Sequence, residues 1–353
     1  MVSLRDSNFC GVAPSLRSAR GEDVRGRRGV GRNAAHVLCH FFARGKRVKY
    51  ILEKIIFLAI LNLIIMDIIP QLIVNSIIAG AIYAMIALGF NLIYGTAKFF
   101  DLGYGALTAV GGYAVFYFYK TLGLDLYVSI LFGVLIAGIV GFVVYKIVYS
   151  PLRKRKSSSM VLLVAALGVL TALQAIIAIL FTSQFQTLSK NAGDEHVYTI
   201  FGGVITETQV ITLILGLIIM VAIALVFKNT LFGKAIKAIG DDEEVSKIVG
   251  INTEKIIGWV FFIGSAIGGL AGILIGFDTG IQPTMGLDLL LKGVIACIIG
   301  GIGNVYGGVL GAFLLAFIEN FGIWKISGEW KDAIAFGVLI LFLLFRPQGI
   351  LKK

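Results

Sequence analysis

The sequence has few charged residues for its length. Only 14% of its 353 residues are Asp, Glu, Lys or Arg, whereas 58% are hydrophobic and the mean hydropathy is +0.93. Soluble domains carry about 25% charged residues, so the polar side chains here are too few to cover a globule in water. Lipid is therefore the expected solvent for most of the chain. The composition excludes a soluble enzyme and predicts a membrane protein with several spans.

Cysteine and histidine are also scarce, with three residues of each. Cys10 and Cys39 precede the apolar stretches and Cys297 lies within one, so neither a disulfide framework nor a CxxC metal site can form. The three histidines are equally scattered. We therefore expect no metal and no other cofactor, and the few polar residues within the apolar stretches do not assemble a catalytic constellation.

The sequence also lacks an energy source. It contains no G-x-x-x-x-G-K-[ST] phosphate loop. It has no string of Asp, Glu, Arg and His inside the apolar stretches, such as ion-coupled transporters often use. If the protein is a pump, its motor is a separate polypeptide.

Much of the net charge of +11 lies in a basic, Gly-rich head over residues 1–65. This head has no apolar periodicity, so we expect it to be disordered. Its position favours a cytoplasmic flank or a non-native extension over a nucleic-acid-binding arm. A weaker apolar segment at 55–66 is short for a span and is expected to be a signal-anchor or an interfacial segment.

The remaining apolar segments predict an all-α, polytopic transmembrane helical bundle with about 8–9 spans. The predicted spans are 71–93, 102–119, 126–149, 160–181, 208–227, 256–276, 286–301 joined to 306–321, and 331–346. The basic run 153–156 and the loop 228–255 are expected in the cytoplasm, which puts 182–207 outside. A cytoplasmic C-terminus then requires 286–321 to cross twice or to bend back.

Glycines lie in the middle of that stretch. Gly300, Gly301 and Gly303 form the natural place for a helix break. Broken helices at membrane depth are tolerated where they face protein or a wet cavity. A continuous helix that packs closely through small residues is the alternative.

The loop 228–255 contains a helix signal of its own. Asp241 is the predicted N-cap, with Glu244 three residues later, as in a capping box. Asp242 and Glu243 fill the first turn, where the helix dipole favours acidic side chains.

This short helix carries one narrow apolar stripe, formed by Val245, Ile248 and Val249. Gly250 is expected at the C′ position that ends it. Because so short a helix is unstable alone, the stripe needs a surface to pack on. A partner subunit would supply that surface; the alternative is the membrane or the protein's own bundle.

The sequence resembles a known family at this loop and elsewhere. The loop is similar to the EAA-like cytoplasmic loop of ABC importer permeases at Gly233, Ala238, the acidic cluster and 250–252. Further stretches resemble the branched-chain amino acid (Liv-type) permeases, in particular the shorter, LivH-like member. These stretches are 75–84, 87–95, 263–266, 269–272, 300–304 with 307–308, and 346–349. Together the resemblance covers residues 66–353, which is 353 − 66 + 1 = 288 residues.

The resemblance implies an import complex in the cell inner membrane. Its other members would be ABC ATPase subunits, a second permease subunit (a sister or a copy of this chain) and a periplasmic or lipid-anchored substrate-binding protein. Membrane lipid is a further partner, and no nucleic acid is expected. The implied ATPase-coupling residues are Gly233, Ala238, Asp241, Asp242, Glu243, Glu244, Val245, Ile248, Val249 and Gly250.

Polar residues inside the predicted spans are candidates for the translocation path, because polar groups at membrane depth face the bundle interior. These residues are Asn75, Asn91, Gln174, Asn304 and Glu319. Each could instead bridge two helices by a hydrogen bond.

The expected function is that of a permease subunit of an ATP-driven importer for branched-chain or other apolar amino acids. A permease for urea, short amides or other amino acids is the nearest alternative. An ATPase-independent secondary transporter or channel is a more distant one, and a non-transporting scaffold has little support.

Met66 is the expected family start, which makes residues 1–65 an extension. We therefore predict that a chain beginning at Met66 inserts into the membrane and supports full transport. An uptake assay on cells that express only the shortened chain tests this. Failure of that chain to insert would show that the head is part of the working protein.

Overall fold

The computed structural model describes residues 68–188, 197–200, 202–324, 327–346 and 348–351. These residues all belong to the unit Met66–Lys353. The basic head 1–65 and the weak apolar segment 55–66 lie outside them, so the expectations for these two segments stay predictions.

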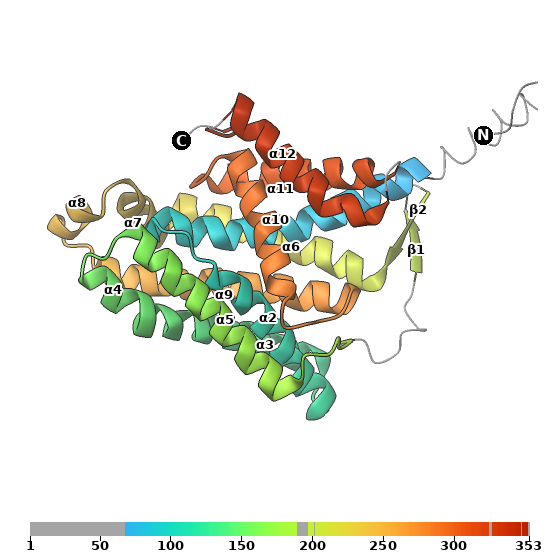
Figure 1. Cartoon of the computed structure of the whole chain (residues 1–353), viewed down its shortest axis with the longest axis horizontal. Coiled ribbons are helices and arrows are strands. Elements are labelled where there is room, and N and C mark those ends of the chain that lie inside the picture. Colours follow the sequence, from blue (N-terminus) through green and yellow to red (C-terminus); the bar gives the residue numbers. More distant parts are fainter. Residues whose placement is uncertain (1–67, 189–196, 201, 325–326, 347, 352–353) are drawn as a thin grey trace, which may run out of the picture. The chain divides into compact units, whose positions relative to one another are not determined.

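The described residues are almost entirely helical (Figure 1). The first half contains the helix Ile68–Ala97, α2 (Gly103–Val115), a π-helical turn (Phe116–Thr121), α3 (Leu126–Val144), a second π-helical turn (Tyr145–Tyr149), α4 (Ser150–Lys154) and α5 (Ser159–Phe181). The second half contains β1 (Val197–Ile200), β2 (Gly203–Thr206), α6 (Glu207–Asn229), α7 (Leu231–Asp241), α8 (Glu243–Ile248), α9 (Thr253–Asp278), α10 (Met285–Gly300), α11 (Val305–Ile323), a 3-10 turn (Gly328–Trp330) and α12 (Lys331–Phe345).

Helices occupy all the spans that the sequence predicts. Six helical runs are long and apolar enough to cross a membrane: Ile68–Ala97, Leu126–Lys154, Ser159–Phe181, Glu207–Asn229, Thr253–Asp278 and Val305–Ile323. The all-α bundle of a multi-pass membrane protein is confirmed. The count of 8–9 spans stays a prediction, because α2, α10 and α12 have only 13, 16 and 15 residues.

α2 lies inside the bundle, with α3, α5, α9 and α10 packed around it. Its backbone touches that of α9, because glycines stand at the crossing. A Cβ on Gly111 would lie 2.5 Å from the carbonyl oxygen of Gly269, and one on Gly272 would collide with the carbonyl of Thr108. Lipid tails are as apolar as the side chains, so membrane helices associate largely through such close packing.

Two groups of loops mark the two ends of the bundle. At one end Arg153 pairs with Glu243, and the Lys154 Nζ lies 2.8 Å from a Glu254 carboxylate oxygen. These contacts bring the basic end of α4 to α8 and to the start of α9, and we call this the α8 end. The sequence placed both loops on one side of the membrane, and they do lie together.

The opposite end carries a β-hairpin, and we call it the hairpin end. β1 and β2 pair antiparallel from Val197 opposite Thr206 to Ile200 opposite Gly203, and Gly202 has φ +84°. The Gln71 side chain holds β2 through two hydrogen bonds with the Val204 backbone, of 2.7 and 3.1 Å. The helix Ile68–Ala97 therefore begins at the hairpin end. The sequence predicts only a loop over 182–207, so the two strands are a new feature of the structure.

The glycine contact between α2 and α9 yields a prediction. Replacement of Gly272 with valine should destabilise the protein by about 1–3 kcal/mol or more, because the side chain has no room beside the Thr108 carbonyl. Thermal unfolding of the detergent-solubilised protein measures the change. Gly168→Val is the matched control, since Gly168 lies exposed on α5 with nothing within 4 Å of its Cβ position. Equal unfolding temperatures for the two variants would contradict the packing account.

Candidate functional site

The short helix α8 is capped by an acidic side chain at its start. Asp242 Oδ1 accepts hydrogen bonds from the backbone N–H groups of Glu244 (2.8 Å) and Val245 (3.1 Å). The prediction that Asp241 caps this helix is wrong: Asp241 is the last residue of α7. A helix runs up to that position, so the extended conformation that a cap needs falls on Asp242, at φ −149° and ψ 116°.

Gly250 ends α8 as predicted. Its φ is +90°, and its N–H donates to the Lys247 carbonyl at 3.0 Å. The next N–H, of Ile251, donates to the Ser246 carbonyl at 3.0 Å. These two bonds form a Schellman motif, which satisfies carbonyls that the helix leaves free. Caps at both ends thus compensate for a helix that is too short to be stable alone.

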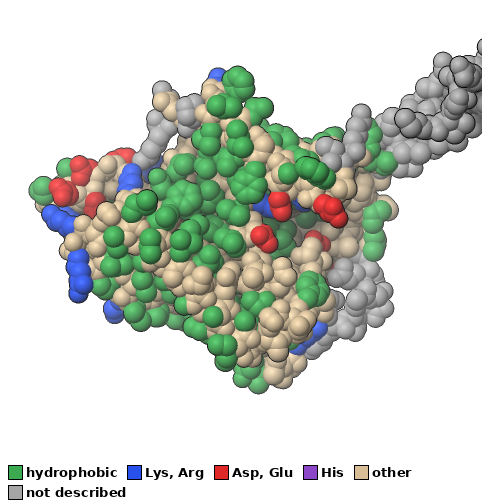
Figure 2. All heavy atoms as spheres, viewed as in Figure 1, with side chains coloured by type: hydrophobic (Ala, Val, Ile, Leu, Met, Phe, Trp, Pro, Cys, Tyr) green, Lys and Arg blue, Asp and Glu red, His purple; other side chains and the backbone are tan. Residues whose placement is uncertain are grey.

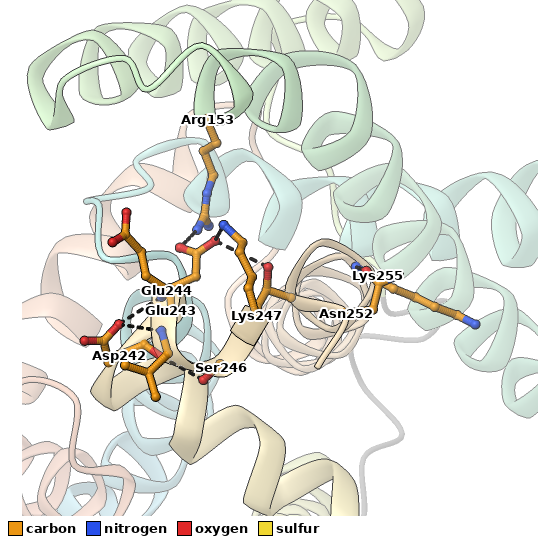
Figure 3. Close-up of polar contacts among 10 residues, drawn as sticks. Arg153, Asp242, Glu243, Glu244, Ser246, Lys247, Asn252 and Lys255 are labelled. Carbon is orange, nitrogen blue, oxygen red and sulfur yellow. Dashed lines mark hydrogen bonds and ion pairs between the residues drawn. The ribbon is translucent and has the colours of Figure 1, made fainter. Parts of the chain in front are cut away.

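One side of α8 is fixed to the bundle by charge. Figure 3 shows Arg153 reaching from α4 to Glu243, with Lys247 on the same carboxylate; the two nitrogen–oxygen distances are 2.5 and 2.9 Å. The Thr253 hydroxyl, at the start of α9, donates at 3.5 Å to Glu243 Oε1, the oxygen that Lys247 also contacts. Ser246 is buried on this face. The contacts tie α8 to α4, which ends the long apolar run Leu126–Lys154, and to α9, which is itself a long apolar helix.

The charge state of Glu243 suits this role. Burial alone would raise the pKa of its carboxyl, but the Lys247 hydrogen bond and the Arg153 charge outweigh burial and lower it. A lowered folded-state pKa means that the stabilisation is present at neutral pH and is lost only as the pH falls through the acid range. The attachment of α8 is therefore intact under ordinary conditions.

The other side of α8 is apolar and exposed. Val245, Ile248 and Val249 have 53%, 84% and 75% of their surface accessible. Asp242 and Glu244 are exposed beside them. The stripe does not pack on the protein's own bundle in the described residues, so an open apolar patch with an acidic border faces away from the protein. Such a patch is typical of a docking surface.

The helix before α8 was not foreseen. α7 buries Gly233, Ile236, Ile239 and Gly240, while Lys234 and Lys237 are exposed. That periodic alternation of isoleucine and lysine is the signal that sequence analysis passed over.

Two glycines fix the path of α7. A Cβ on Gly233 would collide with the Val226 carbonyl of α6, so glycine lets the chain turn back sharply. Gly240 packs on the Gly95 carbonyl in the same way, at 2.8 Å from its Cβ position. The Ala238 carbonyl accepts the Asp242 N–H at 3.0 Å. α7 thereby links α8 to α6 and to the helix Ile68–Ala97.

The predicted glycine break lies at this same end. α10 ends at Gly300, and Gly301 and Gly303 have φ of +112° and +85°. Asn304 then caps α11 through the N–H groups of Tyr306 (3.1 Å) and Gly307 (3.3 Å). α10 and α11 are therefore two separate helices that fold back on each other, with the Gly300 and Gly307 backbones in contact.

Asn91 holds the turn between α10 and α11. Its Nδ2 donates to the Asn304 carbonyl at 3.1 Å, and its Oδ1 accepts the Gly303 N–H at 2.9 Å. The C-terminal segment covers the other side, because the N–H groups of Ile350 and Leu351 donate to the Ile299 and Gly300 carbonyls at 2.9 and 3.1 Å. The Asn91 side chain thus links the helix Ile68–Ala97 to this turn, whereas the Asn304 side chain caps its own helix.

A pocket of about 270 Å³ separates this turn from α7. Its walls include Asn91 and Gly95, Phe227 on α6, Gly240 on α7 and Asn304. α7 and the turn between α10 and α11 therefore face one open volume, into which α7 has room to move.

The other polar candidates are dispersed. Asn75 accepts a hydrogen bond from Gln71 at 2.9 Å near the hairpin end, and Gln174 lies half-buried on α5. Glu319 is fully buried on α11 and accepts the Tyr83 hydroxyl at 2.9 Å. The five candidates do not form one site. In the described residues, no group of three or more His, Cys, Asp or Glu is placed to hold a metal ion.

Sequence reasoning also missed charged residues around Glu319. Lys292 Nζ lies 3.2 Å from Asp332 Oδ1, and Lys331 Nζ lies 3.8 Å from Glu319 Oε2. Lys292 stands inside a predicted span, at 286–301, and a lysine there is itself a signal of function.

Comparison with known proteins identifies the family. The family model described as branched-chain amino acid transport system, permease component, matches residues 72–343. The high-affinity branched-chain amino acid transport system permease protein BraD of Pseudomonas aeruginosa is 30% identical over 295 residues, covering 80% of this chain and 95% of BraD. The corresponding protein LivH of Escherichia coli K12 is 30% identical, covering 79% and 94%. A probable LivH of Methanocaldococcus jannaschii is 24% identical, covering 78% and 90%.

The matched region runs from the helix Ile68–Ala97 to α12 and includes α8 and the turn between α10 and α11. The relatives are permease components and not enzymes. The chain therefore belongs to the family of permease components of branched-chain amino acid transport systems.

Proposed function

We propose that this chain is a permease subunit of an ATP-driven importer that moves branched-chain amino acids inward across the inner membrane. The relatives named for branched-chain amino acid transport support this substrate class. The observation that carries the proposal is the docking helix α8, with an exposed apolar stripe on one side and an ion-paired attachment to the bundle on the other.

ATP hydrolysis takes place on a separate subunit in this proposal. The chain has no phosphate loop, so the energy must arrive through a protein contact. Val245, Ile248 and Val249 enter a groove on the ATPase, and the acidic residues around them meet basic residues on its rim. An amphipathic helix in an apolar groove is a common mode of recognition, with residues three and four apart as anchors.

Force passes from α8 into the bundle by two routes. Arg153 conveys it to α4 and α3, and α7 conveys it to α6 and the helix Ile68–Ala97. The pocket beside α7 leaves room for a rigid-body shift, and the turn at 301–304 lies on its far side. Small shifts of packed helices are a known means of switching between two states.

The remaining partners complete the importer. A second permease subunit, either a sister chain or a copy of this one, forms the other half of the path. A periplasmic or lipid-anchored binding protein selects the amino acid and delivers it at the hairpin end. A permease for urea or short amides has no support from the relatives named above.

The docking stripe generates a sharp test. Ile248→Asp should weaken association with the ATPase subunits at least tenfold and abolish amino acid uptake, because a buried unpaired carboxylate is costly at the centre of an interface. Co-purification of the ATPase and uptake of radiolabelled leucine by cells measure the two effects.

The matched control is Ile248→Val, which keeps the apolar stripe and should behave as the wild type. Both variants should fold normally, since the side chain is 84% exposed. If Ile248→Asp kept ATPase association and uptake, the assignment of α8 as the coupling helix would be wrong.

A further inference from the structure

A group of charged side chains surrounds Glu319, away from the docking helix. Tyr83 donates to one Glu319 oxygen, and Glu319 Oε1 is buried without a hydrogen-bond partner. Lys331 lies 3.8 Å from the same carboxylate. Lys292 Nζ lies 5.6 Å from the Tyr83 ring centroid and pairs with Asp332 at 3.2 Å. Four elements contribute to this group: the helix Ile68–Ala97, α10, α11 and α12.

The group reaches the middle of the bundle. Tyr83 is 83 − 68 = 15 residues from one end of the helix Ile68–Ala97 and 97 − 83 = 14 from the other. At 1.5 Å per residue, it lies about 20 Å from each end. Lys292, which contacts Tyr83, is likewise in the middle of α10 (Met285–Gly300). Its ammonium therefore lies at a depth where the hydrocarbon of a membrane would otherwise be.

The same group opens to the surface. Asp332 is 67% exposed and Lys292 is 16% exposed. Asp288 is exposed one turn before Lys292 on α10, so both residues lie on one face of that helix. Figure 2 shows red and blue side chains grouped within the otherwise apolar surface, where Figure 1 places α10 and α12. A face with charges of both signs at this depth is unsuited to lipid and must meet water or protein.

Stability does not explain why these charges are present. An ion pair whose acidic partner is mostly exposed adds little to stability, whereas a lysine at the centre of a span is expensive. Two apolar residues would hold α10 against α12 equally well. Charges of this kind within a membrane protein ordinarily serve the passage of a polar solute.

The chemistry of the group matches the head group of an amino acid. A zwitterion carries one carboxylate and one ammonium within a few ångströms. Lys292 presents a cation and Asp332 an anion at 3.2 Å from each other, and each can exchange its partner for the opposite charge of a zwitterion. The apolar side chain of the substrate needs no specific partner beyond the hydrophobic face around them.

A pocket connects the group with the hairpin end. It has a volume of about 290 Å³ and is lined by Asn75, Gln209 and Asp278 at the hairpin end and by Tyr83 and Lys331 toward the middle. An amino acid delivered at the hairpin end would meet this pocket before the Lys292–Asp332 pair.

The geometry points to the face of α10 and α12 that carries Lys292 and Asp332 as a transient binding site for the zwitterionic head group of the transported amino acid. The substrate carboxylate binds at Lys292 and its ammonium at Asp332, with Asp288 as a second anion. This proposal rests on the proposed function. It adds where the path runs and how the substrate head group is oriented in it. The original ion pair re-forms when the substrate leaves, so the site holds the substrate only weakly.

The test uses the complete complex with its ATPase subunits and binding protein in proteoliposomes. Leucine uptake and the stimulation of ATP hydrolysis by leucine-loaded binding protein are measured together. Lys292→Met should lower uptake at least tenfold while hydrolysis is still stimulated to within twofold of the wild type. Lys292→Arg, which keeps the cation, should restore most of the uptake. Lys120→Met, at a half-buried lysine on the π-helical turn after α2, is the matched control.

Asp332→Asn is a second variant, and it should fold normally because the Asp332 side chain is mostly exposed. It should lower uptake in the same way without lowering the unfolding temperature. Wild-type uptake in both variants would overturn the site, and so would a loss of uptake that Lys292→Arg fails to restore. If the unaltered complex took up no branched-chain amino acid, the proposed function itself would fail, and this site with it.

Discussion

The ion pair between Arg153 and Glu243 is the contact on which the account of this protein depends. α8 has only six residues and is too short to hold its own position. The pair, together with Lys247, fastens it to α4 across 90 residues of sequence. Without that attachment, a push on α8 would reach the bundle mainly through α7.

In the proposed mechanism, the bundle behind this attachment moves in rigid parts. Glycines bring backbones into contact where α2 crosses α9, and again where α10 meets α11. At such backbone contacts there are no flexible side chains between the two helices, so a shift of one helix moves the other. The open volume beside α7 and the positive-φ turn at 301–304 are two places where the described structure has room to change. A permease subunit that is moved by a partner ATPase requires rigid helices with flexible connections between a few of them.

Much of this architecture could be predicted from the sequence, because each span carries its own signal. Apolar length gave the helices, and Gly250 and Gly300–Gly303 gave two chain reversals, since only glycine readily adopts those conformations. α7 was missed although its isoleucine–lysine alternation was visible. The cap of α8 was misplaced by one residue because the preceding helix was not recognised.

Other features could not be predicted from short stretches of sequence, because they depend on contacts between distant residues. The partner of Arg153 lies in a distant loop, so its basic run indicated only which side of the membrane it occupies. Asn91 was a candidate for the path, and the turn that it holds lies more than 200 positions away in the sequence. Glu319 was noticed, yet Lys292 and Asp332 beside it were not, since their meaning arises only when α10, α11 and α12 pack together.

The central claim is that force enters the bundle through the Arg153–Glu243 attachment. The most direct test is the number of leucine molecules imported per ATP hydrolysed by the reconstituted complex, compared between the wild type and Arg153→Met. Arg155→Met, at an exposed arginine of the same loop, is the control. The account predicts that Arg153→Met keeps its ATPase subunits but imports severalfold less leucine per ATP, while Arg155→Met matches the wild type. An unchanged ratio in Arg153→Met would contradict it.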